Sequence, residues 1–160
     1  MRELRRSLES VMIKAAVLDT SLQKTHDWLH EIGRELGFDN ERAAYAALRA
    51  TLHAVRDRLP TELVAHLGAE LPMLVRGIYY DGWHPSAVKL KAAHDEDFLD
   101  AMRRELRGHD ELQHVEQVAR TVLRVIDQRL DPGQVDHVLG ALPEQARRLW
   151  QDAQEEEAIP

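Results

Sequence analysis

The sequence predicts an all-α protein, an internally duplicated helical bundle with two similar four-helix repeats plus an N-terminal helix. Apolar residues recur at intervals of three and four through most of the 160 residues, which is the period of one helix face. One long segment also matches a later segment at a constant offset. No stretch keeps the alternation of apolar and polar residues that is typical of a half-buried strand.

The offset defines the two repeats. Residues 49–79 align without gaps on residues 120–150, a shift of 71, and residues 27–36 align on 97–106 at a shift of 70, which places Trp28 over Phe98. We therefore expect one all-helical domain at 20–154, with repeats at 20–83 and 94–154. The identical pairs are Arg49/Arg120, Leu52/Leu123, Arg58/Arg129, Leu59/Leu130, Val64/Val135, His66/His137, Leu71/Leu142, Pro72/Pro143 and Arg76/Arg147.

Each repeat reads as four helices. In the first repeat we expect Gly37 to cap the C-terminal end of the first helix, and Asp39 or Asn40 can cap the start of the second. Pro60 ends the second helix, a short third helix spans 61–68, and a fourth begins near Pro72. The second repeat carries matching signals. Asp131 and Pro132 mark the start of a helix, Gly140 marks its end, and Pro143 marks the start of the next helix.

The second helix carries a leucine face and, opposite to it, an alanine face, so both sides can be covered as in a central helix. We expect its polar flank, which includes His53 and Arg56, to reach water. His66 and His137 stand at matched positions in the short helices, and we expect both imidazoles to be buried.

The two ends of the chain lie outside the repeats. An N-terminal helical extension, residues 1–19, continues the rhythm of three and four into Leu22. Residues 20–23, "TSLQ", have the form of a capping box, so we expect a break there, with the first helix packing on the bundle or on another subunit. The acidic tail, 155–160, is expected to fray.

Composition excludes several classes of function. The net charge of −7 repels phosphate backbones and anionic lipids, so neither nucleic acid nor membrane is expected as a partner. The absence of cysteine removes thiol catalysis, thiolate zinc sites and disulfides, and is compatible with the cytoplasm, where we expect the protein to stay. The longest nearly apolar run, 11–18, is too short to span a bilayer.

The stretch "GIYYDGWHP", 77–85, gathers three aromatic residues. Tyr79 falls on Trp150 of the second repeat, and both complete the apolar row of a fourth helix, which indicates core packing. Gly82 ends that helix, and Trp83 is expected to fold back over its end. Tyr80 points away from the apolar row beside Arg76. Arg76, Tyr80 and Trp83 are therefore the candidate interaction residues.

Histidines raise the question of a metal. His26 and His30 lie four residues apart on one helix face, and Glu111 and His114 have the Glu-x-x-His spacing of di-iron bundles. Such sites need further inward glutamates, and the apolar faces carry Leu, Val and Ile instead. These four residues are weak metal candidates, and we expect no cofactor and no catalytic residue, because no nucleophile elbow or phosphate loop is recognisable.

The run "RLPTELVAHLGAELPMLVRGIYYDGWHPS", 58–86, together with the helix at 23–37, resembles the bacterial family catalogued as domain of unknown function 2267. The resemblance covers about residues 20–150 and is specific in the central run. It implies an all-helical, duplicated cytoplasmic protein and no known activity. Residues 1 to about 12 are an extension that the family pattern lacks, so Met1 and Met12 are both candidates for the natural start.

The leading functional hypothesis is a non-enzymatic helical interaction or scaffold module that self-associates through the N-terminal helix, as a homo-oligomer or with another protein. The alternative is a small-molecule or metal-binding protein with its site in the groove between the two repeats. A third hypothesis, nucleic-acid binding, is disfavoured by the charge.

Overall fold

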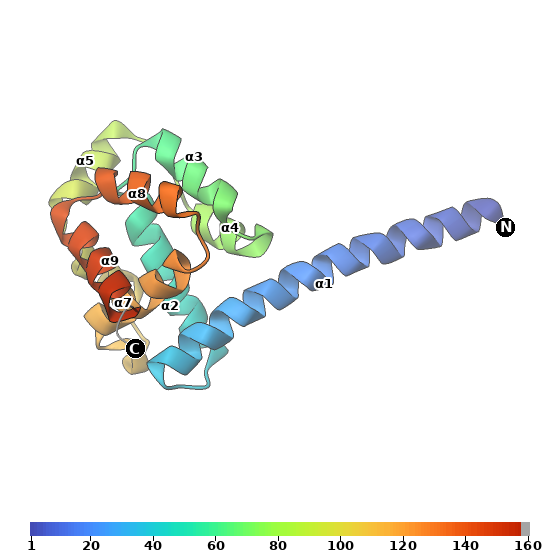
Figure 1. The fold of residues 1–160 in the computed structure, drawn as a ribbon, viewed down its shortest axis with the longest axis horizontal. Coiled ribbons are helices and arrows are strands. Elements are labelled where there is room, and N and C mark those ends of the chain that lie inside the picture. Colours follow the sequence, from blue (N-terminus) through green and yellow to red (C-terminus); the bar gives the residue numbers. More distant parts are fainter. Residues whose placement is uncertain (158–160) are drawn as a thin grey trace.

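The computed structural model describes residues 1–157. In that range the chain forms nine α-helices, one short 3-10 helix (η1) and no strand, so the all-α prediction is confirmed. Figure 1 shows a globular body from which the N-terminal part of α1 projects. The elements are α1 (Arg2–Leu36), α2 (Glu41–Arg56), α3 (Thr61–Glu70), α4 (Met73–Tyr80), α5 (Ala87–Asp95), α6 (Phe98–Glu105), η1 (Asp110–Leu112), α7 (Val115–Asp127), α8 (Pro132–Ala141) and α9 (Glu144–Glu157).

Local capping groups fix several of these boundaries. The Asn40 side chain accepts a hydrogen bond from the Ala43 N–H at 3.2 Å, and α1 ends at Gly37 in the left-handed conformation, φ +81°. Asp131 caps α8 ahead of a proline in the first turn. These three predictions are confirmed. The third helix is longer than predicted, since α3 continues past Gly68 to Glu70.

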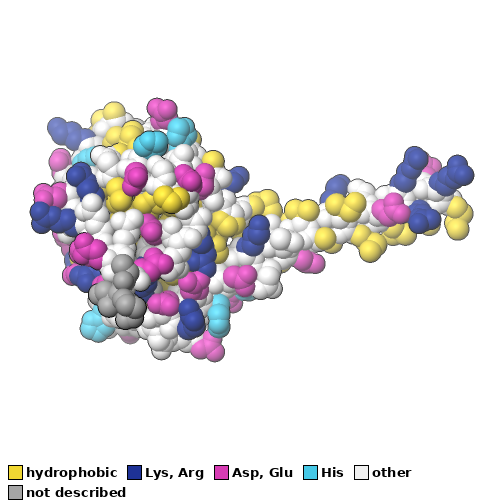
Figure 2. Space-filling model, in the orientation of Figure 1, with side chains coloured by type: hydrophobic (Ala, Val, Ile, Leu, Met, Phe, Trp, Pro, Cys, Tyr) yellow, Lys and Arg dark blue, Asp and Glu magenta, His cyan; other side chains and the backbone are white. Residues whose placement is uncertain are grey.

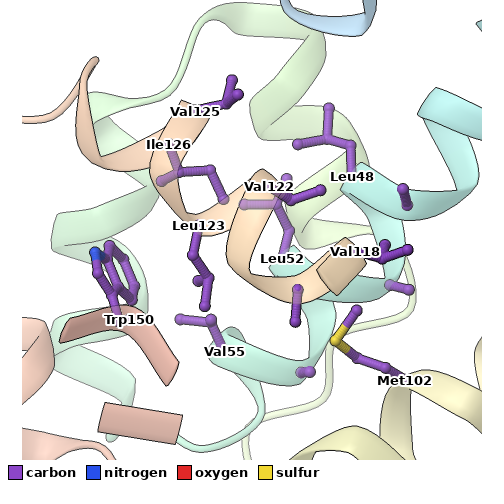
Figure 3. Close-up of a cluster of buried hydrophobic side chains, with 14 of the residues drawn as sticks. Leu48, Leu52, Val55, Met102, Val118, Val122, Leu123, Val125, Ile126 and Trp150 are labelled. Carbon is purple, nitrogen blue, oxygen red and sulfur yellow. The ribbon is translucent and has the colours of Figure 1, made fainter. Parts of the chain in front are cut away.

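The core lies between α2 and α7, which pack directly on one another (Figure 3). Leu48 and Leu52 of α2 and Val122 of α7 have essentially no exposed surface. The alanine face of α2 is also buried, and α2 packs against α1, α4, α6 and α7. The prediction that the second helix is central is therefore confirmed. Side chains of Met102 and Trp150 close the cluster from α6 and α9.

Residues 71 apart make corresponding contacts. The Arg76 guanidinium donates to the carbonyls of Gly68 and Leu71, and Arg147 donates to those of Leu139 and Leu142. Arg58 donates to the Ala54 carbonyl and stacks over Phe98, while Arg129 donates to the Val125 carbonyl and stacks over Trp28. Each of these two arginines thus covers an aromatic ring that comes from the other half of the chain.

The predicted break at residues 20–23 is wrong. α1 is one continuous helix from Arg2 to Leu36. The Thr20 and Ser21 hydroxyls donate to the carbonyls of Ala16 and Val17, four residues back, instead of capping a new helix. A serine or threonine in mid-helix can satisfy its hydroxyl in this way without ending the helix.

One helix was not predicted, and two further expectations are corrected. The segment between the repeats contains α5, which the apolar rhythm did not reveal because α5 has no buried residue. The prediction that the acidic tail frays is wrong for residues 155–157, which belong to α9. Glu156 binds Arg120 and Arg124. Residues 158–160 lie outside the described residues. His66 and His137 are both exposed, so their predicted burial is also wrong.

Candidate functional site

The aromatic cluster lies at the end of α4 and is largely part of the packing. Tyr79 is fully buried, its hydroxyl donates to the Val64 carbonyl at 2.9 Å, and burial raises the pKa of this hydroxyl. The Tyr80 ring stands edge-on to Tyr79 with centroids 4.9 Å apart, and Trp83 lies 5.7 Å from Tyr80. Trp83 is half-buried against the core, as expected of a residue that folds back over the helix end.

The proposed interaction residues Arg76 and Tyr80 are both engaged within the chain. Arg76 donates to the carbonyls of Gly68, Ala69 and Leu71, which lie at the C-terminal end of α3. Tyr80 is half-buried and its ring lies directly on Gly68. These contacts give both residues a structural role in joining α3 to α4.

A change at Gly68 tests this contact. A Cβ at residue 68 would lie 2.3 Å from the Tyr80 hydroxyl oxygen and 2.7 Å from its ring, so Gly68→Ala forces the aromatic side chain to move. We expect a loss of about 1–3 kcal/mol in the free energy of unfolding, measured by urea denaturation. Gly140→Ala is the matched control, because a Cβ there meets open space; equal effects of the two changes would contradict the assigned contact.

The four weak metal candidates do not converge on one point. His26 and His30 line the same hollow of about 710 Å³ beside the α1–α2 loop, where the His26 ring binds the Glu41 carboxylate. Glu111 accepts a hydrogen bond from Asn40 at 3.2 Å. His114 lines a separate hollow with Arg120 and Arg124. Among the described residues no group of three or more His, Asp or Glu side chains is close enough to hold one ion.

A buried polar network was missed in the sequence. His53 and Arg56, which were expected to reach water, are only 6% and 4% exposed. The His53 ring contacts the Ile78 carbonyl through Nε2 at 2.7 Å and the Glu105 carboxylate through Nδ1 at 2.9 Å. Arg56 donates to the carbonyls of Tyr79 and Asp81. These groups therefore tie α2 to the end of α4 and to α6.

Charges in this network hold the Glu105 carboxylate ionised. Burial alone would raise the pKa of Glu105, but the hydrogen bond and electrostatic interaction with His53 and the positive charges of Arg49 and Arg56 together outweigh burial and lower it. Arg49 also binds Asp81 at 3.0 Å and lowers the pKa of that carboxyl. Every charged group named here has a partner within the chain, so the network joins α2 to the end of α4 and to α6.

The boundary between the repeats, where the alternative hypothesis places a ligand, is filled along α2 and α7 by packed side chains (Figure 3). A hollow of about 640 Å³ lies between α5, the loop at 82–86 and the end of α2, and residues of both predicted repeats line it. Two of its charged lining residues, Glu96 and Arg104, form an ion pair with one another. These two side chains are thus paired within the chain.

Among residues 1–157, the longest uninterrupted run of exposed residues is the projecting part of α1. We call residues 1–22 the arm and residues 28–157 the body. Every residue from Met1 to Thr20 is exposed. Figure 2 shows apolar side chains along the projecting helix. A run with alternating spacings of four and three, which we call the stripe, consists of Leu4, Leu8, Val11, Ala15, Leu18 and Leu22.

The stripe has the spacing of a coiled-coil seam. Steps of four and three residues place apolar side chains at the a and d positions of heptads, which pack against a second helix. The same run continues through Thr25 to Leu29 and Ile32, which are buried against the body at 6% and 0% exposure. α1 therefore uses the C-terminal part of one face inside its own fold and leaves the N-terminal part of that face uncovered.

An all-α body with an uncovered helical arm defines a helical domain with a candidate protein-interaction surface. The sequence profile of the family described as uncharacterized conserved protein (DUF2267) matches residues 25–149, and the chain belongs to this family. The match begins after the arm and covers the body as far as residue 149. No curated protein matches the chain. Within the described residues no helix is both long enough and apolar enough to cross a membrane.

Proposed function

We propose that the protein is a non-enzymatic helical interaction module that self-associates through the stripe on the arm. The observation that carries this proposal is the exposure of the stripe: Leu4, Leu8 and Val11 are 62%, 56% and 61% exposed. Contiguous apolar surface of this kind on a protein is typical of an interaction site.

The low stability of a helix that packs against nothing supports a partner for the arm. Helices in water gain most of their stability from packing of an apolar face, and a projecting helix without such packing is marginal. Each leucine or valine that becomes fully buried contributes about 1.5–3 kcal/mol. A pair of arms would bury ten such side chains, the four leucines and Val11 of each stripe, which is enough to exceed an association cost of about 4–15 kcal/mol.

The test is the mass of the full chain in solution. Light scattering is expected to give twice the 18.3 kDa mass of the chain at high concentration. The double variant Leu8→Asp/Leu18→Asp places charge in the seam and is expected to be monomeric, with a dissociation constant raised at least a hundredfold. Ser10→Asp/Thr20→Asp adds the same charge to exposed positions off the stripe and should remain associated. A monomeric native chain would contradict the proposal.

We also propose that residues 20–154 arose by internal duplication, with repeats at 20–83 and 94–154. Support comes from the matched hydrogen bonds of Arg76 and Arg147 and from the reciprocal stacking of Arg58 and Arg129 over rings of the opposite half. The pairings of α2 with α7 and of α3 with α8 agree with a pseudo-twofold arrangement.

We further propose that the protein acts in the bacterial cytoplasm, with a second copy of itself as partner in preference to nucleic acid or membrane. The net charge of −7 supports this choice, because it disfavours contact with phosphate backbones and anionic lipids. The alternative of a ligand or metal site between the repeats draws less support, since packed side chains occupy that boundary along α2 and α7.

A further inference from the structure

We propose that two copies associate with their arms antiparallel, in a register that places Leu4 against Leu22 of the second copy. This inference rests on the proposed self-association and adds to it the direction, the register and the position of the two bodies.

Direction follows from the side of α1 that the body occupies. Leu29 and Ile32 continue the stripe and are buried against the body, so the body stands on the face that the partner helix must cover. In a parallel pair, residues 25–36 of each copy would have to lie where the body of the other copy already stands, and the two bodies would collide. In an antiparallel pair each body lies beyond the N-terminus of the partner helix, as the projection of the arm in Figure 1 permits.

Register follows from the extent of the exposed stripe. In an antiparallel pair, residues at heptad position a of one copy lie opposite residues at heptad position d of the other copy. Only the pairing in which residue numbers add to 26 brings all six stripe residues into contact: Leu4 with Leu22, Leu8 with Leu18, and Val11 with Ala15 of the second copy. Moving the register by one heptad in either direction reduces the paired residues to four. The full overlap, residues 4–22, is about 28 Å long.

Of the two charged contacts beside the seam, the one that involves Arg5 favours this register, whereas the like charges of Lys14 oppose it. Arg5 lies next to the stripe on one flank and meets Asp19 of the second copy, and the symmetric pair forms at the other end. Met12 meets Met12 of the second copy on the same flank, so this exposed apolar side chain is also covered. Lys14 meets Lys14 on the opposite flank, where the long side chains reach water.

Disulfide trapping tests the direction. The chain has no cysteine, so single cysteines can be introduced as Leu8→Cys and Leu18→Cys in chains that carry tags of different size. After mixing and mild oxidation, the 8–18 disulfide between the two variants is expected to form at least tenfold more efficiently than 8–8 or 18–18, because only residues 8 and 18 come within bonding distance. Ser10→Cys mixed with Ala16→Cys is the control, since both positions lie off the stripe.

The outcomes separate this inference from the proposed function. A dimer that gives 8–8 disulfides as efficiently as 8–18 overturns the antiparallel arrangement and leaves self-association standing, whereas a monomeric chain overturns both. Small-angle X-ray scattering on the native dimer gives a second readout that needs no substitution. An elongated particle with two separated bodies is expected, and a compact particle with adjacent bodies would overturn the proposal.

Discussion

Replacing Trp150 with alanine is expected to lower the free energy of unfolding by about 3–5 kcal/mol. Trp150 has no exposed surface and packs where α9 meets the cluster between α2 and α7. Its indole N–H donates to the Asp127 carboxylate at 2.8 Å. The substitution therefore removes a large apolar contact, leaves a cavity and deprives Asp127 of one donor. Urea denaturation at a fixed protein concentration measures the change.

Trp150→Phe separates the contribution of the buried ring from that of the hydrogen bond to Asp127. It retains most of the buried ring but removes the donor, while Gln154 still donates to the same Asp127 oxygen at 2.8 Å. A loss of about 1–2 kcal/mol is expected, well below that of Trp150→Ala. If Trp150→Ala unfolded at the same urea concentration as the native chain, the assignment of Trp150 to the core would be wrong.

Arg58→Ala is expected to cost about 2–3 kcal/mol. Arg58 is 1% exposed, donates to the carbonyls of Ala54 and Glu96, and lies 5.3 Å above the Phe98 ring. Burial lowers the pKa of its guanidinium, as expected for a charge held away from water. The loss arises because two buried acceptors are left without their donor and a cavity opens beside Phe98.

An exposed arginine provides the comparison for Arg58. Arg148 forms an ion pair with Glu144 on the surface, with both side chains about 72% exposed. Arg148→Ala is expected to change the free energy of unfolding by about 0.5 kcal/mol or less. Equal losses for Arg58→Ala and Arg148→Ala, in the same urea titration, would contradict a buried role for Arg58.

Helix signals that act through the backbone were readable in the sequence. Asn40, Asp131 and Gly37 act at the predicted helix ends because a cap depends on its immediate neighbours. The break predicted from the capping box at 20–23 was wrong because the Thr20 and Ser21 hydroxyls donate to carbonyls one turn back in the same helix. The same residues fit a capped helix start and a mid-helix position, so the sequence alone does not distinguish the two. α5 was missed because it buries no residue and so leaves no apolar rhythm.

The burial of polar side chains was much harder to predict, because it depends on hydrogen-bonding partners that are distant in the sequence. His53 lies on the flank of α2 that looks solvent-exposed in the sequence, but α4 supplies the Ile78 carbonyl and α6 supplies Glu105. His66 was expected inside because its repeat partner is identical, yet both positions face water. The stripe itself was visible in the sequence, but whether it faced the body could be seen only once α1 proved continuous.

Amide hydrogen exchange along α1 tests most directly whether the stripe is covered by a partner. At a protein concentration that favours association, the amides of residues 8–18 are expected to exchange slowly, and dilution should abolish this protection while residues 28–36 stay protected by the body. If residues 8–18 exchanged at the same fast rate at every concentration, the arm would have no partner and the stripe would not be an interface between copies.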